Sequence, residues 1–109
     1  YTPQHTLSLH DALPISLVHP VRRDLTKLPL QSKTKFDVIC ANLIYDVLLS
    51  ERKKIVNRLA RSGSLILAGI LQSQFAQVKT TYEKMGMKLT TTKIGKEWQS
   101  GRFVFRQLR

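Results

Sequence analysis

Apolar residues occur along the chain in runs whose spacing differs from segment to segment. Residues 36–43 form a near-continuous apolar run rich in β-branched side chains, which is typical of a strand covered on both faces of a sheet. After Gly63, which we expect to end a turn, residues 64–69 form a second run of this kind. Residues 88–94 alternate, and residues 101–106 follow a short turn, so both predict strands near the end of the chain.

Two segments between these runs repeat apolar residues at helical spacing. Residues 46–60 predict one helix whose buried face carries Leu48, Ile55 and Leu59. Residues 72–85 predict a second helix, with apolar positions at Phe75, Val78, Tyr82 and Met85. Gly86 follows this helix, where we expect it to adopt a left-handed conformation and cap the last turn.

The order of these elements predicts the fold class. Residues 17–35 form an irregular entry with one short strand at 18–22, and the rest is strand, helix, strand, helix, strand, strand. Strands that alternate with helices imply right-handed crossovers and a parallel sheet. The short final link implies a terminal antiparallel hairpin. We therefore expect an α/β fold, a parallel sheet with flanking helices closed by a hairpin.

The net charge and the cysteine content indicate which binding partners and which cellular compartment to expect. The 109 residues suffice for one domain and carry a formal net charge of +11, with every Lys and Arg after His19. A basic surface attracts nucleic acid, but these residues are scattered and lack interleaved aromatics, which favours a solvated surface. Cys40 is the single cysteine, so no internal disulfide forms, which fits a reducing, cytoplasmic setting. No apolar run could cross a membrane.

The first sixteen residues differ from the rest of the chain. Residues 6–15 resemble the conceptual translation of a sequencing-adapter oligonucleotide, and this stretch contains no Lys or Arg. We predict that residues 1–16 are an artefact and that 17–109 are a partial domain. His5, His10 and Asp11 are then not metal ligands or an acid/base pair, and we expect no metal site. The lone His19 is expected at the surface.

Three further segments carry a family resemblance. Residues 36–44, FDVICANLI, resemble the fourth strand of class I S-adenosylmethionine-dependent methyltransferases with its "ANL" motif. Residues 63–71, GSLILAGIL, resemble the fifth strand, and Glu97-Trp98 resembles the "EW" pair that opens the last strand. The combination resembles PrmA-type ribosomal protein methyltransferases over about residues 23–106. The chain then corresponds to the C-terminal half of their Rossmann-like catalytic domain.

The resemblance implies a donor, an acceptor and a set of site residues. S-adenosylmethionine is the methyl donor, and the acceptors are lysine and N-terminal amines of a large-subunit ribosomal protein. Asn42 ends a strand where ligands bind in open α/β sheets, and the resemblance implies that it contacts the cofactor; capping of a turn is the alternative. Asp24 resembles part of a "GDL" element near the adenine, although Arg23 replaces the glycine. Candidates for the substrate channel are Leu43, Tyr45 and Trp98.

Part of the expected machinery is missing from the sequence. The glycine-rich loop that lets the backbone approach the cofactor does not occur in these 109 residues. We therefore expect the parent protein to be a methyltransferase and the chain alone to be inactive. Three alternatives remain: the same fold acting on a small molecule, RNA or another protein; a basic RNA-binding module without catalysis; and a fragment of a non-enzymatic or dehydrogenase-like α/β domain.

Overall fold

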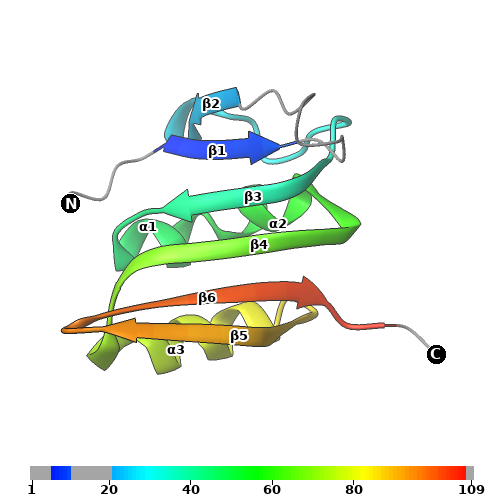
Figure 1. The fold of residues 1–109 in the computed structure, drawn as a ribbon. Helices are drawn as coiled ribbons and strands as arrows, with labels where there is room; N and C mark the ends of the chain where they lie inside the picture. Colours follow the sequence, from blue (N-terminus) through cyan, green and yellow to red (C-terminus); the bar gives the residue numbers. More distant parts are fainter. Residues whose placement is uncertain (1–5, 11–20, 108–109) are drawn as a thin grey trace.

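The computed structural model describes residues 6–10 and 21–107, which form one six-stranded sheet with helices on one face (Figure 1). The strand order across the sheet is β2-β1-β3-β4-β6-β5. The strands are β1 (Thr6–His10), β2 (Val21–Asp24), β3 (Phe36–Asn42), β4 (Leu59–Leu71), β5 (Met87–Gly95) and β6 (Trp98–Phe105). The helices are α1 (Tyr45–Ser50), α2 (Arg52–Asn57) and α3 (Gln72–Glu83), and a 3-10 turn, Leu25–Lys27, follows β2.

The pairing of the strands confirms the predicted α/β class. β3 and β4 are parallel neighbours, with Ile39 beside Leu65 and Ala41 beside Leu67. β4 then pairs antiparallel with β6, and β5 and β6 form the expected antiparallel hairpin. β1, which belongs to the segment assigned to an adapter, pairs antiparallel with both β2 and β3. The foreign origin of that segment stays a prediction.

The helix predicted over residues 46–60 is wrong as a single element, because the structure divides it in two. Glu51 has φ −103° and ψ 15°, which interrupts the helix between α1 and α2. The Arg52 guanidinium donates to the carbonyl of Leu49 at 2.7 Å, which satisfies an acceptor near the break. α2 ends at Asn57 because the next carbonyl, that of Arg58, accepts from the Phe36 amide at 2.8 Å and draws the chain into the sheet.

The second predicted strand is longer than expected and contains Gly63 in its interior. β4 already begins at Leu59, so Gly63 does not end a turn. A Cβ atom at Gly63 would lie 3.0 Å from the carbonyl oxygen of Asp37, so the absence of a side chain allows close approach to β3. By contrast, Gly86 has φ +88°, which confirms the left-handed conformation predicted after α3.

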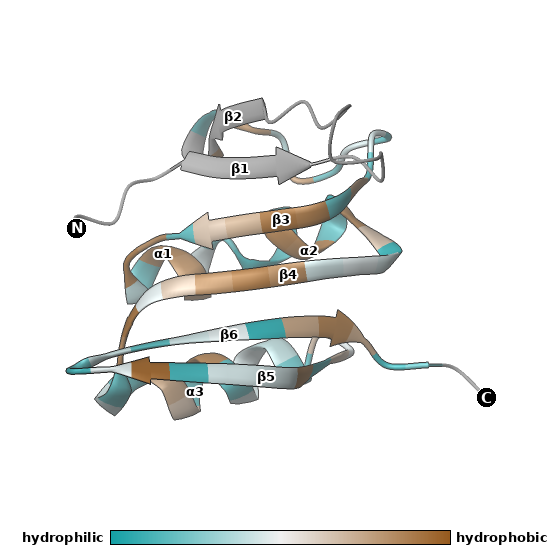
Figure 2. Ribbon diagram, viewed as in Figure 1, coloured by the Kyte–Doolittle hydropathy of each residue, from teal (hydrophilic) through white to brown (hydrophobic). Residues whose placement is uncertain are grey.

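All three helices cover the same face of the sheet, and the hydrophobic core lies between them and the central strands (Figure 1). The apolar residues of β3 and β4 run through the middle of the sheet (Figure 2). Fully buried core side chains come from strands and helices alike: Ile39, Leu65, Leu67, Ile70 and Phe103 from the sheet, and Leu48, Ile55, Val78 and Tyr82 from the helices. None of the described helices is long and apolar enough to span a bilayer.

Two polar side chains in this core are satisfied by main-chain carbonyls. The Tyr82 hydroxyl donates to the carbonyl of Leu48 at 2.8 Å and joins α3 to α1. The Arg58 guanidinium donates to the carbonyls of Lys54 at 3.0 Å and Pro29 at 2.7 Å, which holds the entry loop against α2. Buried polar groups that are paired in this way avoid a desolvation penalty.

A bulge interrupts β4 near its end. Leu67 pairs with Gly101 and Ile70 with Gln99, so Ala68 and Gly69 together face Ser100 of β6. Gly69 has φ +78°, a conformation that side chains other than glycine's rarely adopt. Pairing with β6 resumes at Ile70 and Leu71, so the bulge changes the direction of β4 only locally, beside the site described next.

Candidate functional site

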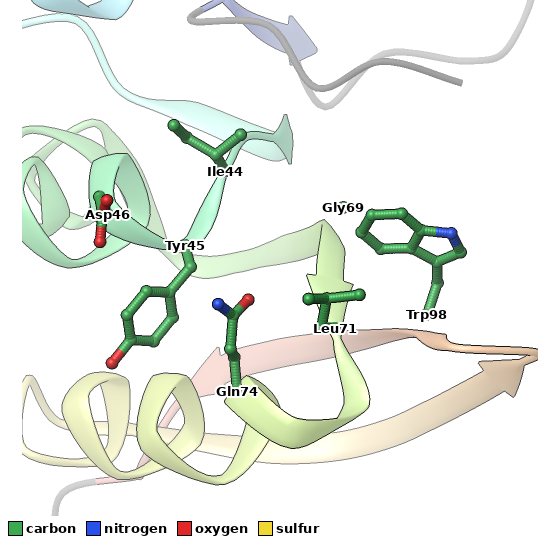
Figure 3. A pocket seen from close by; sticks show the side chains of 7 residues that line it. All are labelled: Ile44, Tyr45, Asp46, Gly69, Leu71, Gln74 and Trp98. Carbon is green, nitrogen blue, oxygen red and sulfur yellow. The ribbon is translucent and has the colours of Figure 1, made fainter.

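A hollow of about 280 Å³ lies at the ends of β3 and β4, where the helices α1 and α3 begin (Figure 3). The chain leaves β3 through Leu43 and Ile44 into α1, and it leaves β4 directly into α3. Both exits meet at one edge of the sheet because the two strands are parallel. The residues that line the hollow are Ile44, Tyr45, Asp46, Gly69, Leu71, Gln74 and Trp98.

Apolar and aromatic side chains form most of the walls of this hollow. Tyr45 stands on the α1 side and Trp98 on the β6 side, with Leu71 between them (Figure 3). Ile44 is 42% exposed and Trp98 is 41% exposed, high values for side chains of this size. Exposed apolar side chains gathered around a concavity are typical of a binding site.

The position of Trp98 is fixed by the start of α3. The main-chain amide of Gln72 donates to the carbonyl of Glu97 at 2.9 Å, and the side-chain amide of Gln72 donates to the carbonyl of Lys96. These two bonds tie the turn between β5 and β6 to the helix. The Trp98 ring therefore borders the hollow from a strand whose end is held at two points.

Polar side chains are few in this hollow. Asp46 and Gln74 contribute the carboxylate and the amide of the lining. The Gln74 amide points toward the space between Tyr45 and Leu71 (Figure 3). Both groups offer an oxygen that accepts hydrogen bonds, so the hollow combines apolar walls with two acceptors for an N–H donor.

Asn42 lies next to this hollow and has an unusual environment. It is the last residue of β3 and pairs with Ala68, the neighbour of Gly69 in the hollow. Its side-chain oxygen Oδ1 is shielded from solvent and accepts no hydrogen bond from the protein. No other side-chain nitrogen or oxygen atom in the described residues is both buried and unpaired. Such atoms are rare in native proteins, and each one calls for a missing partner.

Some of the other residues predicted for the site line the hollow, and others do not. Tyr45 and Trp98 both line the hollow, whereas Leu43 is 0% exposed and belongs to the core. Asp24 ends β2, and the register through β1 brings it to the edge at which β3 ends. One strand separates the backbone of Asp24 from that of β3.

The cysteine and the histidines weighed in the sequence lie in different settings. Burial raises the pKa of the Cys40 thiol, which keeps it protonated and unreactive at neutral pH. Within the described ranges, no cluster of three or more His, Cys, Asp or Glu side chains could hold a metal ion. His5, Asp11 and His19 lie outside the described residues, and His10 belongs to β1.

Sequence reasoning did not single out Gln74, Gly69 or Leu71 as lining residues. Gly69 and Leu71 belong to the strand motif at residues 63–71, and the bulge at Gly69 depends on the pairing of β4 with β6. α3 contains three glutamines, and the orientation of the helix decides that Gln74 lines the hollow. A glutamine in the first turn after a buried strand is the signal that was present.

Comparisons with known proteins agree with this architecture. Residues 13–106 match the family model described as "Ribosomal protein L11 methyltransferase (PrmA)". The ribosomal protein L11 methyltransferase of Desulforapulum autotrophicum is 37% identical over 73 residues, covering 67% of this chain and 24% of that protein. The one from Brucella suis is 34% identical over 80 residues, covering 73% of this chain and 25% of that protein.

A solved structure shares the fold. The ribosomal protein L11 methylase from Lactobacillus delbrueckii subsp. bulgaricus superimposes with a TM-score of 0.65 at 20% identity, over 69% of this chain and 39% of that chain. The present chain spans about a quarter of the length of the curated relatives it matches. Because the family model covers residues 13–106, the chain belongs to the PrmA family of ribosomal protein L11 methyltransferases.

Proposed function

We propose that this chain forms the part of an S-adenosylmethionine-dependent methyltransferase that completes the cofactor site and builds the acceptor pocket for an amine of ribosomal protein L11. The observation that carries the proposal is the buried, unpaired Oδ1 of Asn42 beside the hollow. Family membership supports the reaction class, and the names of the relatives support the acceptor.

Asn42 fits the role of a cofactor contact. S-adenosylmethionine, when bound, supplies a methyl group on a positively charged sulfur. The cofactor also carries amino and hydroxyl groups, and one of these would donate to the free Oδ1 and remove its desolvation penalty. Asp24 reaches the same edge of the sheet from β2 and is the second candidate contact.

The hollow suits an alkyl amine as acceptor. The methylene stem of a lysine would lie between the Tyr45 and Trp98 rings, and such stems pack well on apolar surface. The oxygens of Asp46 and Gln74 would accept from the amine N–H groups and orient its lone pair. Methyl transfer to nitrogen depends mainly on such alignment and on the exclusion of water. Tyr45 and Trp98 therefore act as positioning residues.

We further propose that the 109-residue chain does not methylate by itself. Its sequence contains no glycine-rich loop, and it spans about a quarter of the length of its curated relatives. Backbone contacts to the cofactor from such a loop would have to come from the rest of a parent protein. The names of these relatives favour a ribosomal protein over a small molecule or RNA as acceptor.

A chimera tests the proposal without requiring activity from the isolated chain. The aligned segment of the Desulforapulum autotrophicum enzyme is replaced by the corresponding residues of this chain, and methyl transfer to purified L11 is measured with labelled S-adenosylmethionine. We expect the chimera to label L11 and Asn42→Ala to lower its cofactor affinity about tenfold, the value of one lost hydrogen bond to a polar ligand.

The matched control is Gln77→Ala, which removes an exposed amide on the outer side of α3. It should leave labelling and cofactor affinity unchanged. A chimera that folds and binds cofactor but labels another acceptor would overturn the choice of L11. Equal cofactor affinity with and without the Asn42 amide would overturn the role given to that residue.

A further inference from the structure

The Trp98 ring borders two adjoining hollows. It stands beside Gly69 in the hollow proposed for the acceptor amine, away from Tyr45 (Figure 3). A second hollow, of about 310 Å³, also has Gly69 and Trp98 in its lining. The residue paired with Trp98 on β5 is Gly95, which has no side chain to pack against the ring. Packing therefore restrains the ring weakly, and its place depends on the main chain that carries it.

The turn that carries Trp98 contains a residue in an unfavourable conformation. Lys96 and Glu97 form the two-residue connection between β5 and β6. Lys96 has φ +54°, and among the described residues it is the only one besides glycines with a positive φ. Hairpin connections of this length favour glycine or asparagine at such positions, because other side chains crowd the backbone there. The sequence of the turn does not by itself favour its conformation.

Gln72, the first residue of α3, supplies hydrogen bonds that hold this turn. Its main-chain amide donates to the carbonyl of Glu97 at 2.9 Å, and its side-chain amide donates to the carbonyl of Lys96. One residue of the helix thus binds two consecutive carbonyls of the turn. Because Trp98 follows directly, the two bonds fix its main chain relative to α3, the helix that also carries Gln74 of the acceptor hollow.

We propose that the side chain of Gln72 is a positioning residue for the acceptor: it holds the β5–β6 turn and, through it, orients the Trp98 ring against the alkyl stem of the amine. The N–H donor of this side chain carries the role, and its contribution to the helix does not. The inference rests on the proposed function for its meaning in methyl transfer. The restraint on Trp98 needs neither cofactor nor acceptor, so it is tested on the 109-residue chain.

Two substitutions at Gln72 separate positioning from helix stability. Gln72→Glu keeps the shape of the side chain but removes its donor, and it places a negative charge in the first turn of α3, where the helix dipole favours one. Gln72→Lys keeps an N–H donor and places the disfavoured charge there. If the residue only supported α3, the glutamate variant would be the better of the two. If it positions Trp98, the glutamate variant is the worse.

Trp98 reports its own restraint, because it is the only tryptophan of the chain. Quenching of its emission by acrylamide, a neutral molecule, measures access to the ring, and thermal unfolding measures stability. We expect Gln72→Glu to raise the quenching constant by up to about twofold without loss of stability, because a ring that is 41% exposed has that much further exposure to gain. Gln72→Lys should keep the quenching of the unsubstituted chain.

The matched control is Gln77→Glu, which adds the same charge to α3 at an exposed position with no bond to the turn. Its quenching should equal that of the unsubstituted chain. Unchanged quenching in Gln72→Glu, or an equal rise in Gln72→Lys or Gln77→Glu, would overturn the proposal. A rise in Gln72→Glu that comes with a matching loss of stability would also overturn it, because the residue would then serve α3 and not Trp98.

The chimeric enzyme distinguishes failure of this inference from failure of the proposed function. Gln72→Glu should lower kcat/KM for L11 about tenfold through misalignment of the amine, with unchanged cofactor affinity. If an active chimera loses nothing by this change, Gln72 does not position the acceptor and the proposed function stands. If no chimera labels L11 but quenching rises in Gln72→Glu alone, the restraint on Trp98 is supported and the proposed acceptor is contradicted.

Discussion

The helix-covered face of the sheet and the edge at the ends of β3 and β4 treat buried polar groups in opposite ways. Under the helices, the Tyr82 hydroxyl and the Arg58 guanidinium both donate to main-chain carbonyls. At the edge, Asn42 Oδ1 is equally shielded from water and has no partner. Polar groups that serve the fold are satisfied within the chain, so we expect the unpaired Oδ1 of Asn42 to find its partner in another molecule or segment.

The largest effect on stability should come from the helix-covered face, where the buried polar groups are paired. Tyr82 is 0% exposed and contacts Phe103, with ring centroids 5.9 Å apart. We expect Tyr82→Ala to lower the free energy of unfolding by about 3–5 kcal/mol, because it opens a cavity and leaves the Leu48 carbonyl unpaired. Urea denaturation followed by circular dichroism measures this. A loss below about 1 kcal/mol would mean that α3 does not hold the core together.

Adding a methyl group to the core tests the packing of the same face, in contrast to the side-chain removal above. A Cβ atom at Gly101 would lie 2.7 Å from Leu89 Cδ1 and 2.9 Å from Phe75 Cζ. Gly101→Ala should therefore cost about 1–3 kcal/mol, since neighbouring side chains must leave their rotamers. Gly95→Ala is the matched control, because a Cβ there meets nothing within 4 Å, and it should change stability by less than about 0.5 kcal/mol. Equal costs for the two variants would contradict the packing described here.

The same two regions show how far the sequence alone could lead. Periodicity predicted the buried faces of α1–α3 and the two parallel strands, because local patterns of apolar residues determine which side chains can be buried together. It missed the break at Glu51. It also missed the early start of β4, because that start depends on the bond between Phe36 and Arg58, residues far apart in the sequence. Tertiary hydrogen bonds override a helical pattern at such places.

The candidate site was predictable in part for a similar reason. The strand-end position of Asn42 follows from the sequence pattern, and Tyr45 and Trp98 were named with it. Its missing hydrogen-bond partner, the burial of Leu43 and the place of Gln74 in the lining of the hollow are properties of packed side chains and appear only in the structure.

Removing only the Tyr82 hydroxyl makes a smaller, pH-dependent change. At neutral pH, Tyr82→Phe should cost about 1–2 kcal/mol, because the Leu48 carbonyl loses its donor. Burial raises the pKa of Tyr82 above its ordinary value of about 10. The unfolded state therefore releases this proton first, and the stability that the buried hydroxyl provides is lost as the pH rises above about 10.

The stabilities of wild type and Tyr82→Phe should thus converge above pH 10. Urea denaturation of both proteins at neutral pH and near pH 11 measures the gap, and all other ionisable groups are common to the pair and cancel. A gap that stays constant across this range would show that Tyr82 ionises as easily in the folded as in the unfolded state, contrary to its burial beneath α1.

The smallest effect on stability should fall on the residue with the largest effect on ligand binding. Asn42→Ala removes an acceptor that makes no hydrogen bond, so the chain should lose less than about 0.5 kcal/mol or become slightly more stable. In the chimera, the same change should weaken cofactor binding about tenfold. Thermal unfolding and cofactor titration, both on the chimera, separate the two quantities. A loss of about 2 kcal/mol with unchanged cofactor affinity would place Asn42 with Tyr82 and Arg58 among the residues that serve the fold, because the price of removing an amide is high only where the protein itself supplies its partner.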